Sequence, residues 1–125
     1  MSSSIVILLF CCLIVYLIYI INESNNKKHK IKISYIMPTF PGRHHFHNFS
    51  LHCFLQQDIG LKYIELLIYD DLSDSSSHPS SIFKDISKKY KNIHYYTHNV
   101  PLKLSEKRNY LINHAKGEYI AHWDD

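Results

Sequence analysis

Four short segments, three of them polar or acidic, each follow a run of β-forming residues after residue 30 of this 125-residue chain. They are Pro38–Thr39, Asp70–Asp71, the segment after Thr97, and Asp124–Asp125. An ionised carboxylate only accepts hydrogen bonds, so it suits a ligand that presents N–H or O–H groups. Carboxylate oxygens are also the hard ligands that Mg²⁺ and Mn²⁺ favour. The residue types therefore indicate a site for a polar ligand at these points of the chain.

Alternating strands and helices must position these segments. The hydrophobic patterns predict strands at 31–37, 64–69, 93–97 and 118–123 and helices at 47–57, 82–90 and 104–115. Pro38 should end or edge the first strand, and a loop should follow it to Arg43. Gly117 follows the last helix, where a C-cap glycine is common.

The predicted order is β-α-β-α-β-α-β, which favours an α/β fold with a mostly parallel sheet and right-handed crossovers. The second strand is almost entirely apolar, which is typical of a strand buried on both faces of such a sheet. Parallel sheets bind ligands beyond the carboxyl ends of their strands. All four segments are expected at that edge, so we predict that the ligand binds there.

The first 22 residues have a different character from the rest. No charged residue lies between Ser2 and Asn22, and Ile5 to Ile21 is unbroken apolar or aromatic sequence. A helix of that length covers roughly 25–30 Å, enough to cross the hydrocarbon core of a bilayer. No basic segment precedes it and no small-residue cleavage site follows it. We therefore predict an uncleaved transmembrane anchor at 1–22, a linker at 23–30 and one domain at 31–125.

Charge gives a weaker indication of placement and partners. The formal net charge is +3, and four lysines directly follow the apolar segment, at 27, 28, 30 and 32. Lysines on that side of an anchor favour a single-pass protein with a cytoplasmic domain, and a lumenal domain stays an alternative. The rest of the chain has no continuous basic stripe, so we predict no nucleic-acid binding.

A group of histidines has two interpretations. His44, His45, His47 and His52 lie within nine residues of one another, beside Cys53. Histidine and cysteine are zinc ligands, so the group could hold a metal ion. No C-x-x-C pair or acidic partner accompanies it, and polar surface histidines are the favoured interpretation.

Four segments in order resemble parts of family 2 glycosyltransferases. Ser34–Phe40 resembles their first strand and loop, and Leu66–Asp74 resembles their second strand with its paired aspartates. Lys107–Ile120 resembles the helix and strand that lead to the DXD motif, and Asp124–Asp125 resembles the opening of that motif. The resemblance covers about 31–125. It implies a GT-A fold, in which a Rossmann-like nucleotide-binding half precedes an acceptor half.

The resemblance also implies a role for each strand-end residue. Pro38 and Thr39 would line the nucleotide pocket. Asp70 and Asp71 would form the paired-aspartate site, with Asp71 accepting a hydrogen bond from the uracil ring N–H. Arg108 would approach the base or the phosphates, because a guanidinium matches phosphate geometry.

A divalent metal is implied at the DXD motif. Asp124 and Asp125 would contact the ribose and hold Mg²⁺ or Mn²⁺, which usually also binds substrate phosphates. The metal would neutralise charge on the departing nucleoside diphosphate as a Lewis acid. The donor implied for this inverting transfer is a nucleotide sugar, with UDP as the favoured nucleotide.

Two departures from the family bear on activity. The sequence stops at Asp125, inside the motif, and Pro41–Gly42 replace the polar residue usual after the first-strand aromatic. An inverting transfer needs a general base on the acceptor side. We therefore expect this chain to be inactive alone, with no catalytic residue of its own, and a separate acceptor-domain chain is a candidate partner.

Other interpretations remain open at this point. The chain could be a membrane-tethered module that binds a nucleotide or a partner without turnover, or a small structural membrane protein. Asp70–Asp71 could be a plain strand-to-turn boundary. Arg108 could be a solvated helix residue, and Asp124–Asp125 could be a charged tail.

Overall fold

The computed structural model describes residues 3–26, 30–72, 80–98 and 100–124. The chain divides into two compact units, Met1–Lys30 and Ile31–Asp125. The second unit contains all four predicted strands.

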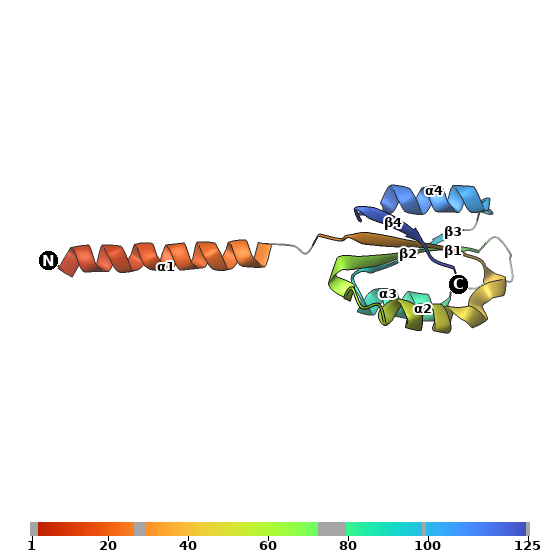
Figure 1. The fold of residues 1–125 in the computed structure, drawn as a ribbon, viewed down its shortest axis with the longest axis horizontal. Helices are drawn as coiled ribbons and strands as arrows, with labels where there is room; N and C mark the ends of the chain where they lie inside the picture. Colours follow the sequence, from red (N-terminus) through yellow and green to blue (C-terminus); the bar gives the residue numbers. More distant parts are fainter. Residues whose placement is uncertain (1–2, 27–29, 73–79, 99, 125) are drawn as a thin grey trace. The chain divides into compact units, whose positions relative to one another are not determined.

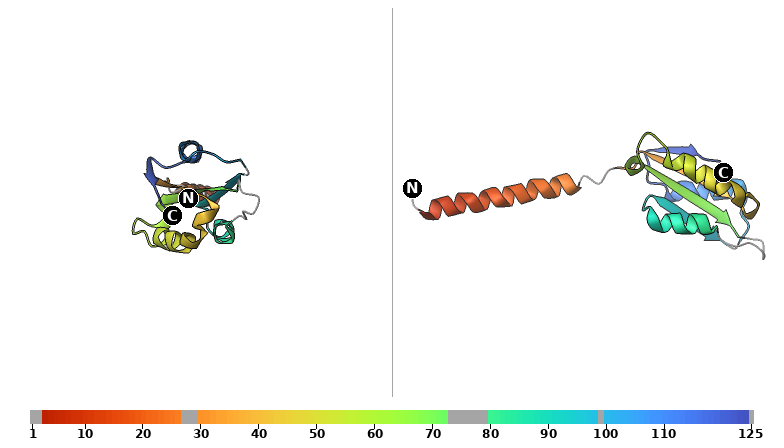
Figure 2. Two further views of the ribbon diagram at one scale, coloured as in Figure 1. Left: turned by 90° about the vertical axis from the view of Figure 1, so that its right-hand side faces the viewer. Right: turned by 90° about the horizontal axis from the view of Figure 1, so that it is seen from below.

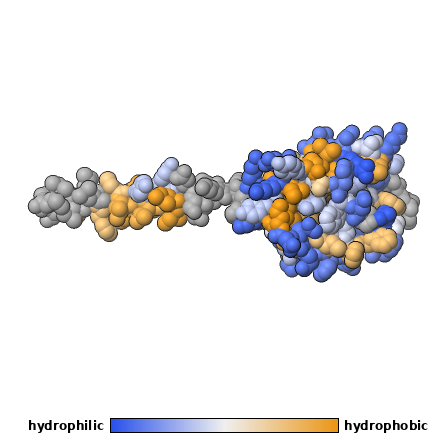
Figure 3. Space-filling model, in the orientation of Figure 1, coloured by the Kyte–Doolittle hydropathy of each residue, from blue (hydrophilic) through white to orange (hydrophobic). Residues whose placement is uncertain are grey.

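The first unit is a single helix, α1, which runs from Ser3 to Asn26. Its described side chains are mostly apolar and exposed to solvent (Figure 3). Among the residues described, no helix has the length and apolar character that a membrane span requires. The transmembrane anchor predicted at 1–22 is therefore not supported. The linker predicted at 23–30 is helical as far as Asn26, since no proline or glycine interrupts the helix before that point.

The second unit is a four-stranded sheet covered by helices on both faces (Figures 1 and 2). The strands lie in the order β3-β2-β1-β4, and every neighbouring pair is parallel. Their bounds are β1 Ile33–Thr39, β2 Ile64–Asp71, β3 Ile93–His98 and β4 Tyr119–His122. The α-helices are α2 His47–Leu55, α3 Ser81–Lys89 and α4 Leu104–His114, and the 3₁₀ helices are η1 Pro41–Phe46 and η2 Leu61–Tyr63. The predicted α/β class, element order and mostly parallel sheet are confirmed.

The core consists of two layers that the sheet separates. Every residue of β2 is buried, as the apolar run predicted. Its alternate side chains enter opposite layers, because successive residues of a strand point to opposite faces. Ile68 belongs to the layer that contains Phe54 of α2 and Phe83 of α3. Tyr69 belongs to the layer that contains Leu111 of α4. Helix α4 therefore covers one face, and α2 and α3 cover the other (Figure 1).

Pro38, which is predicted to end or edge the first strand, lies within β1, one residue before its end. The N–H of Trp123 donates to the carbonyl of Ile36, 3.0 Å away, so the backbone polar groups of Ile36 face β4. Pro38 is the next residue in that alternating series, and the pairing of β1 with β4 stops at Ile36. A proline is tolerated there because its missing N–H would have had no partner strand.

Gly117 is needed for a different reason from the one predicted. Helix α4 ends at Ala115 in an extended conformation (φ −68°, ψ 140°), and not in a left-handed C-cap. A Cβ atom on Gly117 would lie 2.6 Å from the backbone nitrogen and from Oγ of Ser34. The glycine thus allows the α4–β4 connection to approach the start of β1.

Candidate functional site

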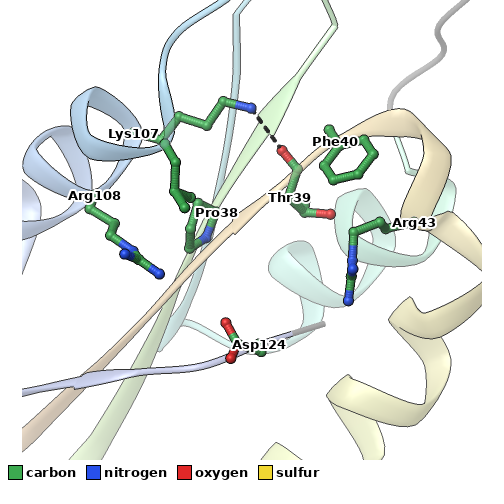
Figure 4. Close-up of a pocket in the computed structure, with 8 residues that line it drawn as sticks. Pro38, Thr39, Phe40, Arg43, Lys107, Arg108 and Asp124 are labelled. Atoms are coloured by element: carbon green, nitrogen blue, oxygen red, sulfur yellow. Dashed lines mark hydrogen bonds between the residues drawn. The ribbon is translucent and has the colours of Figure 1, made fainter.

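A pocket of about 430 Å³ opens at the carboxyl edge of the sheet (Figure 4). The end of β1 supplies one wall, η1 and α4 supply two others, and the segment after β4 supplies the floor. Its lining residues are Pro38, Thr39, Phe40, Arg43, Leu104, Lys107, Arg108 and Asp124. Four of the predicted site residues therefore come together in one cavity: Pro38, Thr39, Arg108 and Asp124.

Two arginines give the pocket an anion-binding character. The guanidinium groups of Arg43 and Arg108 lie on opposite sides of the Asp124 carboxylate in Figure 4. Nε of Arg108 is buried, and it has no hydrogen-bond partner within the described part of the chain. A buried donor of this kind is costly unless a ligand satisfies it. Arg43 was not predicted, because a single arginine in a loop carries no signal without knowledge of what lies opposite.

Asp71 lies beside the pocket in a buried ion pair. Its Oδ2 is 3.0 Å from Nζ of Lys107, and only 8% of the Asp71 side chain is exposed. The N–H of Leu102 donates to the same oxygen at 3.4 Å. Nζ of Lys107 also donates to the carbonyl oxygen of Thr39 at 3.2 Å. Lys107 was also not predicted, since a lysine on a short helix is usually solvated.

Asp70 points away from the pocket, although it is the neighbour of Asp71. Its Oδ2 accepts a 2.6 Å hydrogen bond from the hydroxyl of Tyr95 and lies 3.6 Å from Nε2 of His44. Burial, together with this hydrogen bond and the Asp70 charge, raises the pKa of the Tyr95 hydroxyl far above its ordinary value. The paired aspartates are separated because consecutive strand residues face opposite sides of a sheet.

The histidine group is divided between the surface and the core: His45 and His52 are exposed and His44 is half-buried. His47 is fully buried, so the favoured interpretation is wrong for this residue. Its Nε2 lies 3.0 Å from the hydroxyl oxygen of Thr39, and its Nδ1 lies 3.1 Å from the hydroxyl oxygen of Ser80. No group of three metal-ligating side chains was found among the described residues. His47 instead fixes the Thr39 hydroxyl at the pocket wall.

The backbone that leads to Asp124 is anchored to α2. The indole N–H of Trp123 donates to Oγ of Ser50 at 2.7 Å, and that hydroxyl lies 3.4 Å from the carbonyl oxygen of Asp124. The Asp124 residue itself is exposed. Asp125, the second predicted metal ligand, lies outside the described residues.

The sequence of the second unit identifies the protein family of the chain. The sequence model described as glycosyl transferase family 2 matches residues 34–125. The chain belongs to glycosyl transferase family 2. The match includes every residue of the sheet except Ile33 and every residue of the pocket, so the resemblance to this family is confirmed.

Solved structures with the same fold include TarS of S. aureus. The structure of TarS 1–349 has a TM-score of 0.58 and 22% identity, and the match covers 75% of this chain and 27% of that one. Its complex with UDP-GlcNAc has a TM-score of 0.57 and 24% identity, covering 75% and 26%. Its complex with UDP has a TM-score of 0.56 and 22% identity, covering 75% and 27%. The chain thus spans about a quarter of the length of these proteins. No curated protein matches it.

Proposed function

We propose that residues 31–125 are the donor-binding part of a glycosyltransferase that uses a nucleotide sugar, with UDP as the nucleotide. The observation that carries this proposal is the pocket at the strand ends, where Arg108 has a buried donor with no partner among the described residues. Membership of family 2 supports the reaction class. The UDP and UDP-GlcNAc complexes of TarS support the choice of nucleotide.

The two arginines would hold the diphosphate. A guanidinium donates two parallel hydrogen bonds to a phosphate, and a pocket with low water content strengthens them. Arg43 comes from η1 and Arg108 from α4, so an anion between them would be held from two sides. This arrangement binds the group that leaves when the sugar is transferred.

Asp71 and the end of β1 would hold the base. The uracil ring N–H donates and a carboxylate only accepts, so Asp71 suits this contact. Pro38 and Thr39 line the pocket and would contact the nucleoside. The position of Asp70 beside Tyr95 favours a supporting role, in which it fixes the end of β2.

A divalent metal would bind at Asp124 with the diphosphate. Asp124 is an exposed carboxylate at the floor of the pocket, and Mg²⁺ and Mn²⁺ commonly take one or two carboxylates with several phosphate and water oxygens. Asp124 therefore fits this role, and Asp125 is the second proposed ligand. When bound, the metal would stabilise negative charge on the leaving nucleoside diphosphate. Inversion at the sugar carbon would require an acceptor-side base beyond the residues assigned here.

Membrane attachment through residues 1–22, with a cytoplasmic domain, stays a prediction. Carbonate extraction of membranes from cells that express the tagged chain tests the membrane attachment. Release of the chain into the soluble fraction would contradict it.

Calorimetric titration of the whole chain with UDP, with and without Mn²⁺, tests the proposed function. We expect binding that Asp71→Ala weakens, because the carboxylate to the base is lost. Lys84→Ala is the matched control, since Lys84 is an exposed residue of α3 away from the pocket. A folded chain that binds neither UDP nor UDP-GlcNAc would overturn the proposal. If the chain binds UDP but no sugar is transferred when an acceptor-domain chain is added, the result would favour the non-catalytic binding module.

A further inference from the structure

Lys107 is a buried cation that the proposed donor site does not use directly. It is 7% exposed, and its ammonium lies 3.0 Å from Oδ2 of Asp71 and 3.2 Å from the carbonyl oxygen of Thr39. A buried charge is stable only when it is paired and hydrogen-bonded. The two contacts meet this requirement within the chain, so Lys107 has no need of a ligand.

The contacts of Lys107 connect three elements at one point. Thr39 is the last residue of β1, Asp71 is the last residue of β2, and Lys107 lies in the second turn of α4. Its ammonium therefore fixes the spacing between the ends of two neighbouring strands. It also determines where the Asp71 carboxylate lies relative to the pocket wall.

The two adjacent cations of α4 point to different targets. In Figure 4 the amine of Lys107 points to the carbonyl oxygen of Thr39, whereas the guanidinium of Arg108 extends toward Asp124. Consecutive residues of a helix are about 100° apart around its axis, so they face different surroundings. Arg108 is thus available to an anion, and Lys107 is directed into the protein.

A carboxylate can accept several hydrogen bonds at once. The Asp71 carboxylate has two oxygens and about four acceptor positions, and Lys107 and the N–H of Leu102 both use Oδ2. In the proposed function, the same carboxylate would contact the uracil N–H and the ammonium of Lys107.

We propose that Lys107 is a positioning residue for base recognition, which holds Asp71 and the end of β1 so that the carboxylate selects uracil over cytosine. This inference rests on the proposed function. Ring nitrogen 3 of uracil carries a hydrogen, whereas that of cytosine is an acceptor and would oppose the carboxylate. Sites built around one hydrogen bond reject analogues that cannot make it, provided that the protein group is fixed.

The test compares Lys107→Met with the wild-type full chain for binding of UDP, CDP and inorganic pyrophosphate at one fixed Mg²⁺ concentration. Methionine keeps the apolar stem and removes the ammonium. We expect UDP to bind about ten- to a hundredfold more weakly, which is the effect of one charged hydrogen bond. The ratio of UDP affinity to CDP affinity should fall, and the affinity for pyrophosphate should change less than about threefold.

A double-mutant cycle with Asp71→Asn separates positioning from general damage. If Lys107 acts through Asp71, the two substitutions should be non-additive for UDP, and the second should add little. Lys84→Met is the control for loss of a lysine far from the site. If circular dichroism shows that Lys107→Met is unfolded, Lys107→Gln replaces it, and the same selective loss of UDP binding is expected at smaller size.

The outcomes are distinguishable from failure of the proposed function. A folded wild-type chain that does not bind UDP removes the proposed function and this inference together. Wild-type binding with equal losses for UDP and pyrophosphate in the variant, or with additive effects in the cycle, overturns only the role of Lys107.

Discussion

The two ends of the parallel sheet each contain a buried carboxylate, but their surroundings differ. At the amino ends of the strands, Glu65 of β2 is 1% exposed and contacts side chains and backbone from three other segments. At the carboxyl ends, Asp71 of the same strand is 6% exposed and lies beside the pocket. The same strand thus presents one acid to a closed network and another to the border of a pocket.

The amino end is saturated by the chain itself. Oε1 of Glu65 accepts hydrogen bonds from the hydroxyl of Ser34 and the N–H of Lys116, both at 2.6 Å. Oε2 lies 3.3 Å from Nε2 of His94, and the N–H of Gly117 donates to Oγ of Ser34 at 2.8 Å. Such a network joins the starts of β1, β2 and β3 to the α4–β4 connection.

The carboxyl end keeps polar groups directed at a cavity. Nε of Arg108 is buried with no partner in the described residues, and Asp124 is exposed on the floor. The difference shows that a buried acid is a poor indicator of function when the chain satisfies all its acceptors. The indicator is an adjacent cavity with donors that the chain leaves for a ligand.

The largest expected effect is at the amino end, from Gly117→Ala. The new Cβ would meet backbone atoms of Ile33 and Ser34, which cannot rotate away. We expect a loss of about 3 kcal/mol in the free energy of unfolding. Denaturant unfolding of the whole chain measures it. Gly42→Ala is the control, since its Cβ would meet only the ring of exposed Phe40 and should cost less than about 1 kcal/mol. Similar stabilities for the two variants would contradict this close approach.

Glu65→Gln should have the next largest effect. The glutamine side chain has an NH₂ group in place of one carboxylate oxygen. This group cannot accept a hydrogen bond, so at least one buried donor of the network loses its partner. We expect about 2 kcal/mol lower stability and no change in UDP affinity among molecules that remain folded. Calorimetry beside denaturant unfolding separates the two quantities. A selective loss of UDP binding would show that the two ends are not independent.

Arg108→Gln should affect the carboxyl end alone. Glutamine keeps a donor but lacks the charge, so we expect UDP to bind about tenfold more weakly, equivalent to about 1.4 kcal/mol. Stability should not fall, because Nε of Arg108 has no partner among the described residues. Salt should weaken wild-type binding more than binding by the variant. Equal UDP affinities of the wild type and the variant would show that Arg108 is a solvated helix residue with no role in binding.

The smallest expected effect is the acidic dependence of stability on Glu65. Burial alone would raise the pKa of this carboxyl, but hydrogen bonds from His94, Ser34 and the Lys116 N–H lower it below its ordinary value. A carboxyl with a lowered pKa in the folded state stabilises the fold above its unfolded pKa, and this stability is lost as the pH falls through its folded pKa. Unfolding at several pH values below 5 should therefore be less pH-dependent in Glu65→Gln. An unchanged slope would assign the effect to other acids.

The sequence by itself determined the elements and the edge that carries the site. Apolar runs of different period gave four strands and three helices in the correct order, because burial of one face or two imposes those periods. A parallel sheet brings its strand ends together, so Thr39, Asp71 and Asp124 could be selected as neighbours before any distance was known.

Only the tertiary structure decided what each polar residue does at that edge. Asp70 and Asp71 are adjacent in sequence, and their division between Tyr95 and Lys107 depends on which helix covers each face of the sheet. Lys107 and His47 resemble surface residues until their burial is known, and Gly117 resembles a C-cap until Ser34 is placed against it. Burial and partners are long-range properties, since they depend on segments tens of residues apart, and local patterns contain no record of them.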